Sequence, residues 1–296
     1  MTDQKGKLPN LFLVGAMKSA TTSLHNYLDM HPDIFMTKNP WKEPHFFVEE
    51  NNWKKGFDWY HSLFEEAKNE KYLGESSTDY TKMPHYAGVP ERIKTYCPNA
   101  KIIYIMRDPI ERAISQYWWE VEYSAEGRRM PVAILNNDWI LDGSKYAFQL
   151  MPYINLFGAE NVFTLTTEEL VASPKDTMNR IFTWLNVDTD QNLLEKEYKA
   201  YNPSAKKVNR IMGSGLFSHL KGTIFWELLK KIAPARSPLR SNLRRLLTKP
   251  VEKNDQDRDE TIALLRPIML EQVKELSVLL GREFPEWTTL YGKESS

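Results

Sequence analysis

The chain is poor in cysteine, in excess charge of either sign and in long apolar runs. Cys97 is its one cysteine in 296 residues, which excludes an internal disulfide framework and fits a reducing compartment. Lysine plus arginine and aspartate plus glutamate both total 39, so no global charge favours a nucleic-acid partner. No apolar run is long enough to span a bilayer, and the polar first ten residues leave no room for a signal peptide. We therefore expect a cytoplasmic protein without stable membrane insertion, of unknown oligomeric state.

The usual phosphate-binding loop is also missing, although a related pattern is present. Residues 11–24 (LFLVGAMKSATTSL) indicate a buried strand, a sharp turn at Gly15 and the start of a helix. The free N–H groups and the positive dipole end of such a helix favour an anion. A phosphate loop needs Gly-x-x-x-x-Gly-Lys-Ser/Thr, but Ala20 and Thr21 stand where Gly-Lys should be. The lysine comes early, at Lys18, where it would lie near a group leaving from a bound phosphate.

Strands and helices alternate up to about residue 185. Further strands are predicted at 71–75, 101–106 and 161–166, and helices at 20–30, 57–64, from 109 onward, 146–157 and 175–185. This alternation predicts an α/β fold with a central parallel sheet of about four or five strands and helices on both faces. We expect a single domain over 1–296, with a nucleotide-binding α/β core at 10–200 and a helical, basic extension at 201–296.

The pattern changes after Tyr201. A basic loop is predicted over 202–210 and an amphipathic helix over 216–232, and residues 221–249 carry eight lysines and arginines against one acid. Such a basic segment is most often a solvated face; the alternatives are a lid that brings Arg240 or Arg244 to a bound phosphate, or a membrane-surface helix. A final helix is predicted at about 257–280 with Gly281 as its cap, and Pro267 either kinks it or marks its start.

Polar clusters follow three of the predicted strands, at 18–23, 76–80 and from Arg107 onward. Ligands of open parallel sheets bind beyond the carboxyl ends of the strands, and two of these clusters are cationic, so we expect a ligand with anionic groups at both ends. The third cluster opens a helix, with Asp108 as cap, Pro109 first and Glu111 in a capping-box-like pattern.

Three of these motifs resemble those of a known family. The stretch 15–24 (GAMKSATTSL) resembles the 5′-phosphosulfate-binding loop of sulfotransferases that use 3′-phosphoadenosine 5′-phosphosulfate (PAPS), and 107–115 (RDPIERAIS) resembles their 3′-phosphate motif. The stretches 42–47 (KEPHFF) and 56–60 (GFDWY) resemble the heparan-sulfate-type and bacterial branch of that family. The similarity covers roughly residues 10–185 in order and fades after residue 200.

The resemblance implies a P-loop-like fold and in-line sulfuryl transfer from PAPS to a hydroxyl or amine of a small-molecule or carbohydrate acceptor, without a metal. It implies that Lys18 stabilises the leaving 5′-phosphate and that Glu43 is the base, with His45 as a backup base or an acceptor-orienting group. The implied donor-binding residues are Lys18, Ser19, Ala20, Thr21, Thr22, Ser23, Arg107 and Ser115. Glu43 and His45 are the acceptor-binding residues that the motif implies. We also expect Asp79 and Tyr80 to shape the acceptor pocket and Trp119 to border it, since apolar walls are usual in small-molecule sites.

Two departures from the family pattern and several alternatives stay open. Ala20 replaces a glycine common in the loop, and Ser76 stands where glycosaminoglycan enzymes tend to have a lysine, which favours a small acceptor over a sulfated polymer. Read alone, Lys18 could be an exposed turn lysine, Arg107 a structural partner of an acid such as Glu75, His45 a packed side chain and Asp79 a turn cap. The rival functions are a nucleotide-dependent kinase on a related fold and a non-catalytic protein that binds adenosine 3′,5′-bisphosphate.

Overall fold

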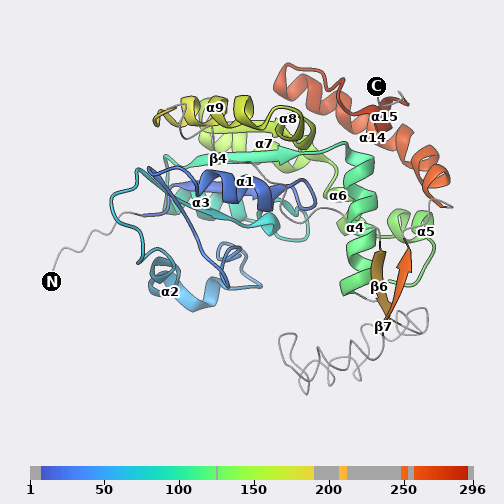
Figure 1. The fold of residues 1–296 in the computed structure, drawn as a ribbon, viewed down its shortest axis with the longest axis horizontal. Helices are drawn as coiled ribbons and strands as arrows, with labels where there is room; N and C mark the ends of the chain where they lie inside the picture. The colour runs from blue at the N-terminus through green and yellow to red at the C-terminus, as the bar shows by residue number, and fades with distance from the viewer. Residues whose placement is uncertain (1–7, 125, 190–206, 212–247, 253–256, 293–296) are drawn as a thin grey trace.

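The structure is a computed structural model that describes residues 8–124, 126–189, 207–211, 248–252 and 257–292. Its centre is a five-stranded parallel sheet in the order β2-β3-β1-β4-β5 (Figure 1). The strands are β1 (Leu11–Gly15), β2 (Ile34–Met36), β3 (Tyr72–Ser76), β4 (Lys101–Met106) and β5 (Val162–Thr166). The expected parallel sheet of four or five strands is thus confirmed, and β2 is the strand that the sequence pattern missed.

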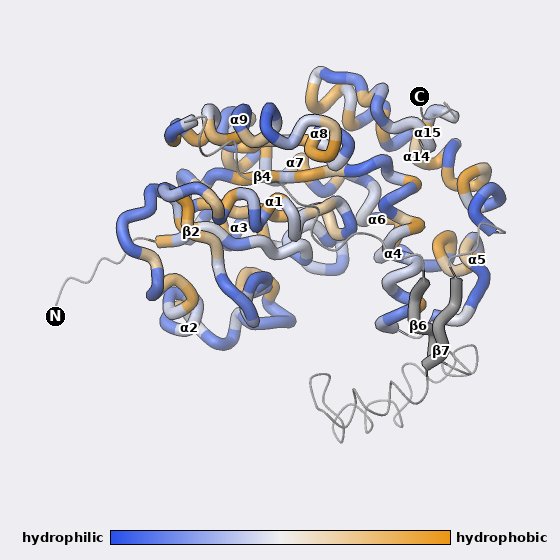
Figure 2. The backbone as a smooth tube through the Cα atoms, viewed as in Figure 1, coloured by the Kyte–Doolittle hydropathy of each residue, from blue (hydrophilic) through white to orange (hydrophobic). Residues whose placement is uncertain are grey.

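Both faces of the sheet are buried, because consecutive residues of each inner strand enter different cores. Phe12 and Val14 of β1 belong to one hydrophobic cluster, whereas Leu11 and Leu13 belong to another, as the two-residue period of a strand requires. In Figure 2 the hydrophobic colour runs along β4, which lies between the two cores.

Helices cover the two faces unequally. One face is covered by α1 (Thr21–Leu28), α8 (Thr167–Ala172) and α9 (Pro174–Leu185). The other is covered by α2 (Gly56–Ser62), α3 (Val89–Tyr96), α4 (Pro109–Tyr123), α5 (Met130–Leu135), α6 (Asp138–Asp142), α7 (Tyr146–Phe157) and α14 (Arg258–Leu280). The predicted helices at 146–157 and 175–185 are therefore confirmed. None of the described helices is long and apolar enough to cross a membrane.

The C-terminal part of the chain returns to the core. Leu265, Met269, Val273 and Leu276 of α14 pack in the same cluster as the sheet, and α14 ends at Gly281 with a φ of 63°, which confirms the predicted cap. Pro267 lies inside α14 and does not mark its start. The short helix α15 (Thr288–Tyr291) follows.

Part of the predicted basic extension is a two-stranded antiparallel ribbon of β6 (Lys207–Ile211) and β7 (Thr248–Glu252), which lies beside α4 (Figure 1). The predicted loop at 202–210 is therefore strand from residue 207 onward. The predicted helix at 216–232, Arg240 and Arg244 lie outside the described residues, as does nearly all of the basic segment 221–249.

The start of α4 is fixed by contacts that are distant in the sequence. Asp108 caps the helix as predicted, because its side chain accepts hydrogen bonds from the N–H groups of Ile110 and Glu111. The capping box does not form: the Asp108 N–H donates to Glu168 Oε1 at 3.0 Å. The Glu111 carboxylate instead pairs with Arg258 of α14 and accepts a 2.7 Å bond from Thr289 Oγ1.

Candidate active site

The turn after β1 brings the start of α1 to the edge of the sheet. At Gly15 a Cβ atom would lie 2.1 Å from Thr81 Oγ1, so only glycine fits where this turn packs against the chain after β3. Lys18 and Ala20 have φ values of 72° and 62°, a left-handed conformation that ordinary side chains disfavour. The helix then begins at Thr21 with no side-chain cap and no acid in its first turn. The uncapped first turn keeps its positive dipole end available for an anion.

The second cationic group lies at the end of β4. The Tyr146 hydroxyl donates to the Arg107 carbonyl at 2.7 Å and accepts from its N–H at 3.4 Å, and Arg107 Nη2 lies 3.7 Å from Glu111 Oε2. Arg107 thus has an acidic partner, as the structural alternative expects, but this partner is Glu111 and not Glu75. Ser115 lies on α4, the helix that follows, eight residues further along the chain.

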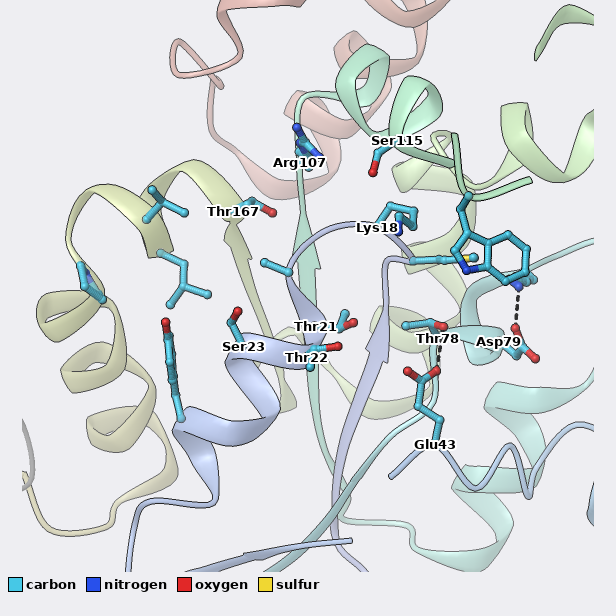
Figure 3. Close-up of a pocket in the computed structure, with 18 of the residues that line it drawn as sticks. Lys18, Thr21, Thr22, Ser23, Glu43, Thr78, Asp79, Arg107, Ser115 and Thr167 are labelled. Carbon is cyan, nitrogen blue, oxygen red and sulfur yellow. Dashed lines mark hydrogen bonds and ion pairs between the residues drawn. The ribbon is translucent and has the colours of Figure 1, made fainter. Parts of the chain in front are cut away.

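A cavity of about 770 Å³ joins the two motifs (Figure 3). In Figure 3, Arg107 and Ser115 lie at one end, Glu43, Thr78 and Asp79 at another, and Lys18 between them. The predicted site residues that line it are Lys18, Ala20, Thr21, Thr22, Ser23, Glu43, His45, Asp79, Arg107, Ser115 and Trp119. The structure thus brings together residues up to a hundred positions apart in the chain.

Ser19 and Tyr80 are the two predicted site residues that do not line this cavity. Ser19 is fully buried, and its N–H donates to the Ala16 carbonyl at 3.2 Å inside the turn. Tyr80 is 1% exposed and lies in the core. Ser76 is buried as well, and its Oγ forms a 2.7 Å hydrogen bond with His25 Nδ1 of α1. These three residues are buried beneath the residues that line the cavity.

Glu43 lies at the other end of the cavity from Arg107 and Ser115, between polar partners. Its Oε2 accepts a 3.1 Å hydrogen bond from Thr78 Oγ1, and its Oε1 lies 3.4 Å from Lys42 Nζ. Lys42 Nζ in turn donates to Thr22 Oγ1 of α1 at 3.3 Å. Lys42 therefore bridges the loop that carries Glu43 and the first turn of α1. The sequence motif did not indicate this contact, because only its glutamate and histidine were considered.

His45 and Asp79 form an ion pair next to Glu43. His45 Nδ1 lies 3.1 Å from Asp79 Oδ2, and Asp79 Oδ1 also pairs with Lys82 Nζ at 2.6 Å. Burial lowers the pKa of His45. The hydrogen bond and the charge of Asp79, together with the charge of Glu43, act in the opposite direction and are stronger, so the pKa of His45 is raised above its usual value. Burial raises the pKa of Asp79, yet His45 and Lys82 hold that pKa well below its usual range. His45 thus tends to keep its proton, so it is a weaker candidate for a base than Glu43.

A fully buried carboxylate holds the loop that carries these residues. Glu75 Oε1 accepts from the hydroxyls of Tyr60 at 2.6 Å and Tyr80 at 2.8 Å, and Glu75 Oε2 accepts from Ser77 Oγ at 2.5 Å. Ser77 Oγ then accepts a hydrogen bond from the N–H of His45 at 2.9 Å, and the Tyr80 hydroxyl accepts one from the N–H of Phe47 at 3.2 Å. Burial raises the pKa of Glu75, and the network sets the backbone of residues 45–47.

The opposite wall of the cavity is apolar. It consists of Tyr27 of α1, Leu170 and Val171 of α8, and Pro174 of α9, none of which the sequence patterns singled out. An apolar wall next to anion-binding groups suits an aromatic ring that carries phosphates. Within the described part of the chain, no three His, Cys, Asp or Glu side chains gather as they would around a metal ion.

Comparison with known proteins gives one family and one fold. Residues 8–222 match the family described as sulfotransferase domain. The chain is 35% identical to the membrane-associated sulfotransferase kil1 of Dictyostelium discoideum over 128 residues, 42% of this chain and 26% of that protein. It is 26% identical to heparan sulfate glucosamine 3-O-sulfotransferase 3B1 of Mus musculus over 221 residues, 71% of this chain and 54% of that protein. The chain therefore spans only part of the length of these relatives.

Among solved structures, the fold is similar to that of a sulfotransferase from Alicyclobacillus acidocaldarius. The TM-score is 0.64 at 23% identity, with 95% of this chain and 98% of that chain covered. This likeness confirms the predicted fold class, a P-loop-like parallel sheet flanked by helices.

Proposed function

Because this chain belongs to the sulfotransferase domain family, we propose that it transfers the sulfuryl group of PAPS to a hydroxyl or amine of a small-molecule or carbohydrate acceptor. The observation that carries the proposal is the single cavity into which the anion-binding turn, Arg107 with Ser115, and Glu43 all open. A donor with phosphates at both ends of a nucleoside and an acceptor next to a base need such an arrangement. The relatives' names include sulfotransferases of heparan sulfate glucosamine, which supports an acceptor with hydroxyl groups.

The residues of the cavity fit each part of the donor. The uncapped first turn of α1, with the hydroxyls of Thr21, Thr22 and Ser23, would hold the 5′-phosphosulfate. Arg107 and Ser115 would hold the 3′-phosphate, which distinguishes PAPS from ATP. The apolar wall of α8 and α9 would face the adenine ring. Ser19 contributes through the turn, which its N–H closes onto the Ala16 carbonyl.

The chemistry that remains is positioning and charge neutralisation. Sulfuryl transfer breaks the bond between the sulfur and the bridging oxygen of the 5′-phosphate and forms a bond from sulfur to the acceptor oxygen or nitrogen. Lys18 would stabilise the negative charge on the leaving phosphate, and Glu43 would take the acceptor's proton. His45, which pairs with Asp79, would orient the acceptor. No step of this scheme uses a metal ion.

Lys18→Ala tests the proposal. Loss of the cation should lower the rate of sulfuryl transfer by roughly two to three orders of magnitude, while binding of adenosine 3′,5′-bisphosphate, measured by calorimetry, falls far less because Arg107 and Ser115 remain. Lys68→Ala, at an exposed lysine before β3, is the matched control and should change neither. Unchanged transfer by Lys18→Ala would refute the mechanism. If the wild-type protein binds bisphosphate but transfers sulfate to no acceptor, the non-catalytic alternative is favoured. If it turns over ATP and needs magnesium to do so, the kinase alternative is favoured.

Glu43→Gln tests the base. The variant keeps the size of the side chain and can still accept from Thr78, but it cannot take a proton. We expect the rate constant for transfer to fall by roughly two to four orders of magnitude with little change in donor affinity. His45→Gln, as the comparison, should raise KM for the acceptor more than it lowers kcat. The reverse ranking of the two variants would move the role of base to His45.

A further inference from the structure

A second cavity continues the first on its acceptor side. It has a volume of about 980 Å³ and shares Thr22, Glu43, His45 and Asp79 with the first. The rest of its lining comes from the loop between β2 and α2, residues 39–42 and 50–52, and from Asn26 of α1. Because Glu43 lines both cavities, a molecule in this space lies next to the proposed base. We call it the acceptor cavity.

Acids outnumber bases in the lining of the acceptor cavity. Its lining includes the acids Glu43, Glu50 and Asp79 but one lysine, Lys42, and no arginine. Lys42 already lies 3.4 Å from Glu43 Oε1, so it does not add a net positive charge. A polysulfated acceptor would bring several negative charges against this lining, and pairing such charges takes several arginines or lysines. The charges of the described lining therefore disfavour a polyanion.

Four asparagines, more than any other residue type, line the acceptor cavity. They are Asn26, Asn39, Asn51 and Asn52. An asparagine amide both donates and accepts hydrogen bonds, which matches hydroxyl groups and suits neither a cation nor an anion specifically. Two of them are already anchored: Asn52 Nδ2 donates to the Pro44 carbonyl at 2.6 Å, and Asn51 Nδ2 donates to Asp79 Oδ2 at 3.3 Å. Anchored groups lose less conformational entropy when a ligand binds.

An aromatic wall completes the lining. Trp41 lies in the acceptor cavity and is held by its neighbours: its ring packs edge-on against Trp59 with the centroids 5.2 Å apart. Lys55 Nζ lies 4.1 Å from the centroid of each of these rings. A fixed indole offers an apolar surface to the C–H groups of a sugar-like ring.

Resting on the proposed function, we propose that the acceptor cavity takes an uncharged, polyhydroxylated acceptor of sugar-like chemistry, bound by asparagine amides and Trp41. The acceptor presents one of its hydroxyls to Glu43. The new S–O bond forms at that hydroxyl, its proton passes to Glu43, and adenosine 3′,5′-bisphosphate leaves. The product carries one sulfate ester, a charge that the lining does not pair, which favours release.

The test uses the whole of this chain and 35S-labelled PAPS, and it compares acceptors of equal length and different charge. The probes are a neutral N-acetylchitooligosaccharide, its cationic deacetylated form and a polysulfated heparin oligosaccharide. We expect transfer to the neutral form with the highest kcat/KM. Asn26→Ala should raise its KM roughly fivefold, the loss of about one hydrogen bond, without changing the Kd of bisphosphate. Asn136→Ala, at an exposed asparagine after α5, is the matched control and should leave both unchanged.

Two results overturn this inference while the proposed function stands. One is a higher kcat/KM with the heparin or the cationic oligosaccharide; the other is bisphosphate binding with no transfer to the neutral oligosaccharide. An unchanged KM in Asn26→Ala would contradict the part of the proposal in which asparagine amides bind the acceptor. Failure of the wild-type protein to bind bisphosphate, in contrast, would refute the proposed function itself.

Discussion

His25 of α1 makes the stability of the protein depend on pH. The side chain is 3% exposed and joins α1 to the ends of two strands, with Nδ1 2.7 Å from Ser76 Oγ and Nε2 3.1 Å from the Thr37 carbonyl. Burial and the nearby charge of Lys42 lower the pKa of His25 to about 3. The folded protein therefore favours the neutral form of the His25 imidazole over the protonated form.

The sign and size of the effect follow from linkage. The unfolded chain binds a proton at this histidine near pH 6.5, and the folded chain only near pH 3, so unfolding takes up a proton between these values. The folded state keeps its full stability above pH 6.5 and loses it as the pH falls. At pH 5, about 1.5 pH units below the unfolded value, the loss amounts to about 2 kcal/mol.

Urea denaturation of the wild type and His25→Asn at pH 7.5 and pH 5.0 measures this loss. Asparagine keeps a polar group near Ser76 but does not titrate, so its own cost is the same at both pH values. We expect the free energy of unfolding to fall by about 2 kcal/mol more in the wild type than in the variant. An equal fall in both proteins would refute the buried neutral histidine and leave other groups to explain the acid sensitivity.

Three further substitutions test the support of the site. Gly15→Ala places a Cβ 2.1 Å from Thr81 Oγ1 and should destabilise the protein by about 1–3 kcal/mol in urea and weaken bisphosphate binding; near-wild-type values would contradict the close packing. Ala20→Gly removes an alanine in the left-handed conformation. It should stabilise the protein by about 0.5–1 kcal/mol, because the relief of backbone strain exceeds the entropy that glycine adds to the unfolded chain. A loss of stability would show that the turn is unstrained. Glu75→Gln removes an acceptor for Ser77 and should lower kcat roughly tenfold with unchanged bisphosphate affinity; unchanged kcat would separate this network from catalysis.

The parts of the fold that sequence predicts well are those that local patterns decide. The strand at 101–106 and the helix at 146–157 have the predicted bounds, because a buried strand needs one apolar run and a helix one periodic stripe. The strand at 34–36 was missed because three residues are too few for either pattern. The cytoplasmic location and the single-domain organisation stay predictions.

The site was predictable where a motif carries its own chemistry and not where a residue acts through distant partners. Lys18 and Arg107 line the cavity as expected, since each follows a strand of a parallel sheet. Tyr80 follows a strand as well, yet its hydroxyl points into the core toward Glu75. That carboxylate's partners come from α2 and from the turn after β3, a tertiary arrangement that no spacing in the chain reveals.

The contacts at the start of α4 join residues that are synthesised early to residues that are synthesised late. Asp108 accepts from the N–H of Leu290 at 2.8 Å across 182 residues, and Glu111 pairs with α14 and Thr289. A nascent chain that still lacks residues 258–292 already holds every residue that we assign to the donor, but the turn of α4 after Arg107 is without these partners. Donor binding should therefore mature late on the ribosome, and a chain released at residue 257 should bind bisphosphate more weakly than the whole chain.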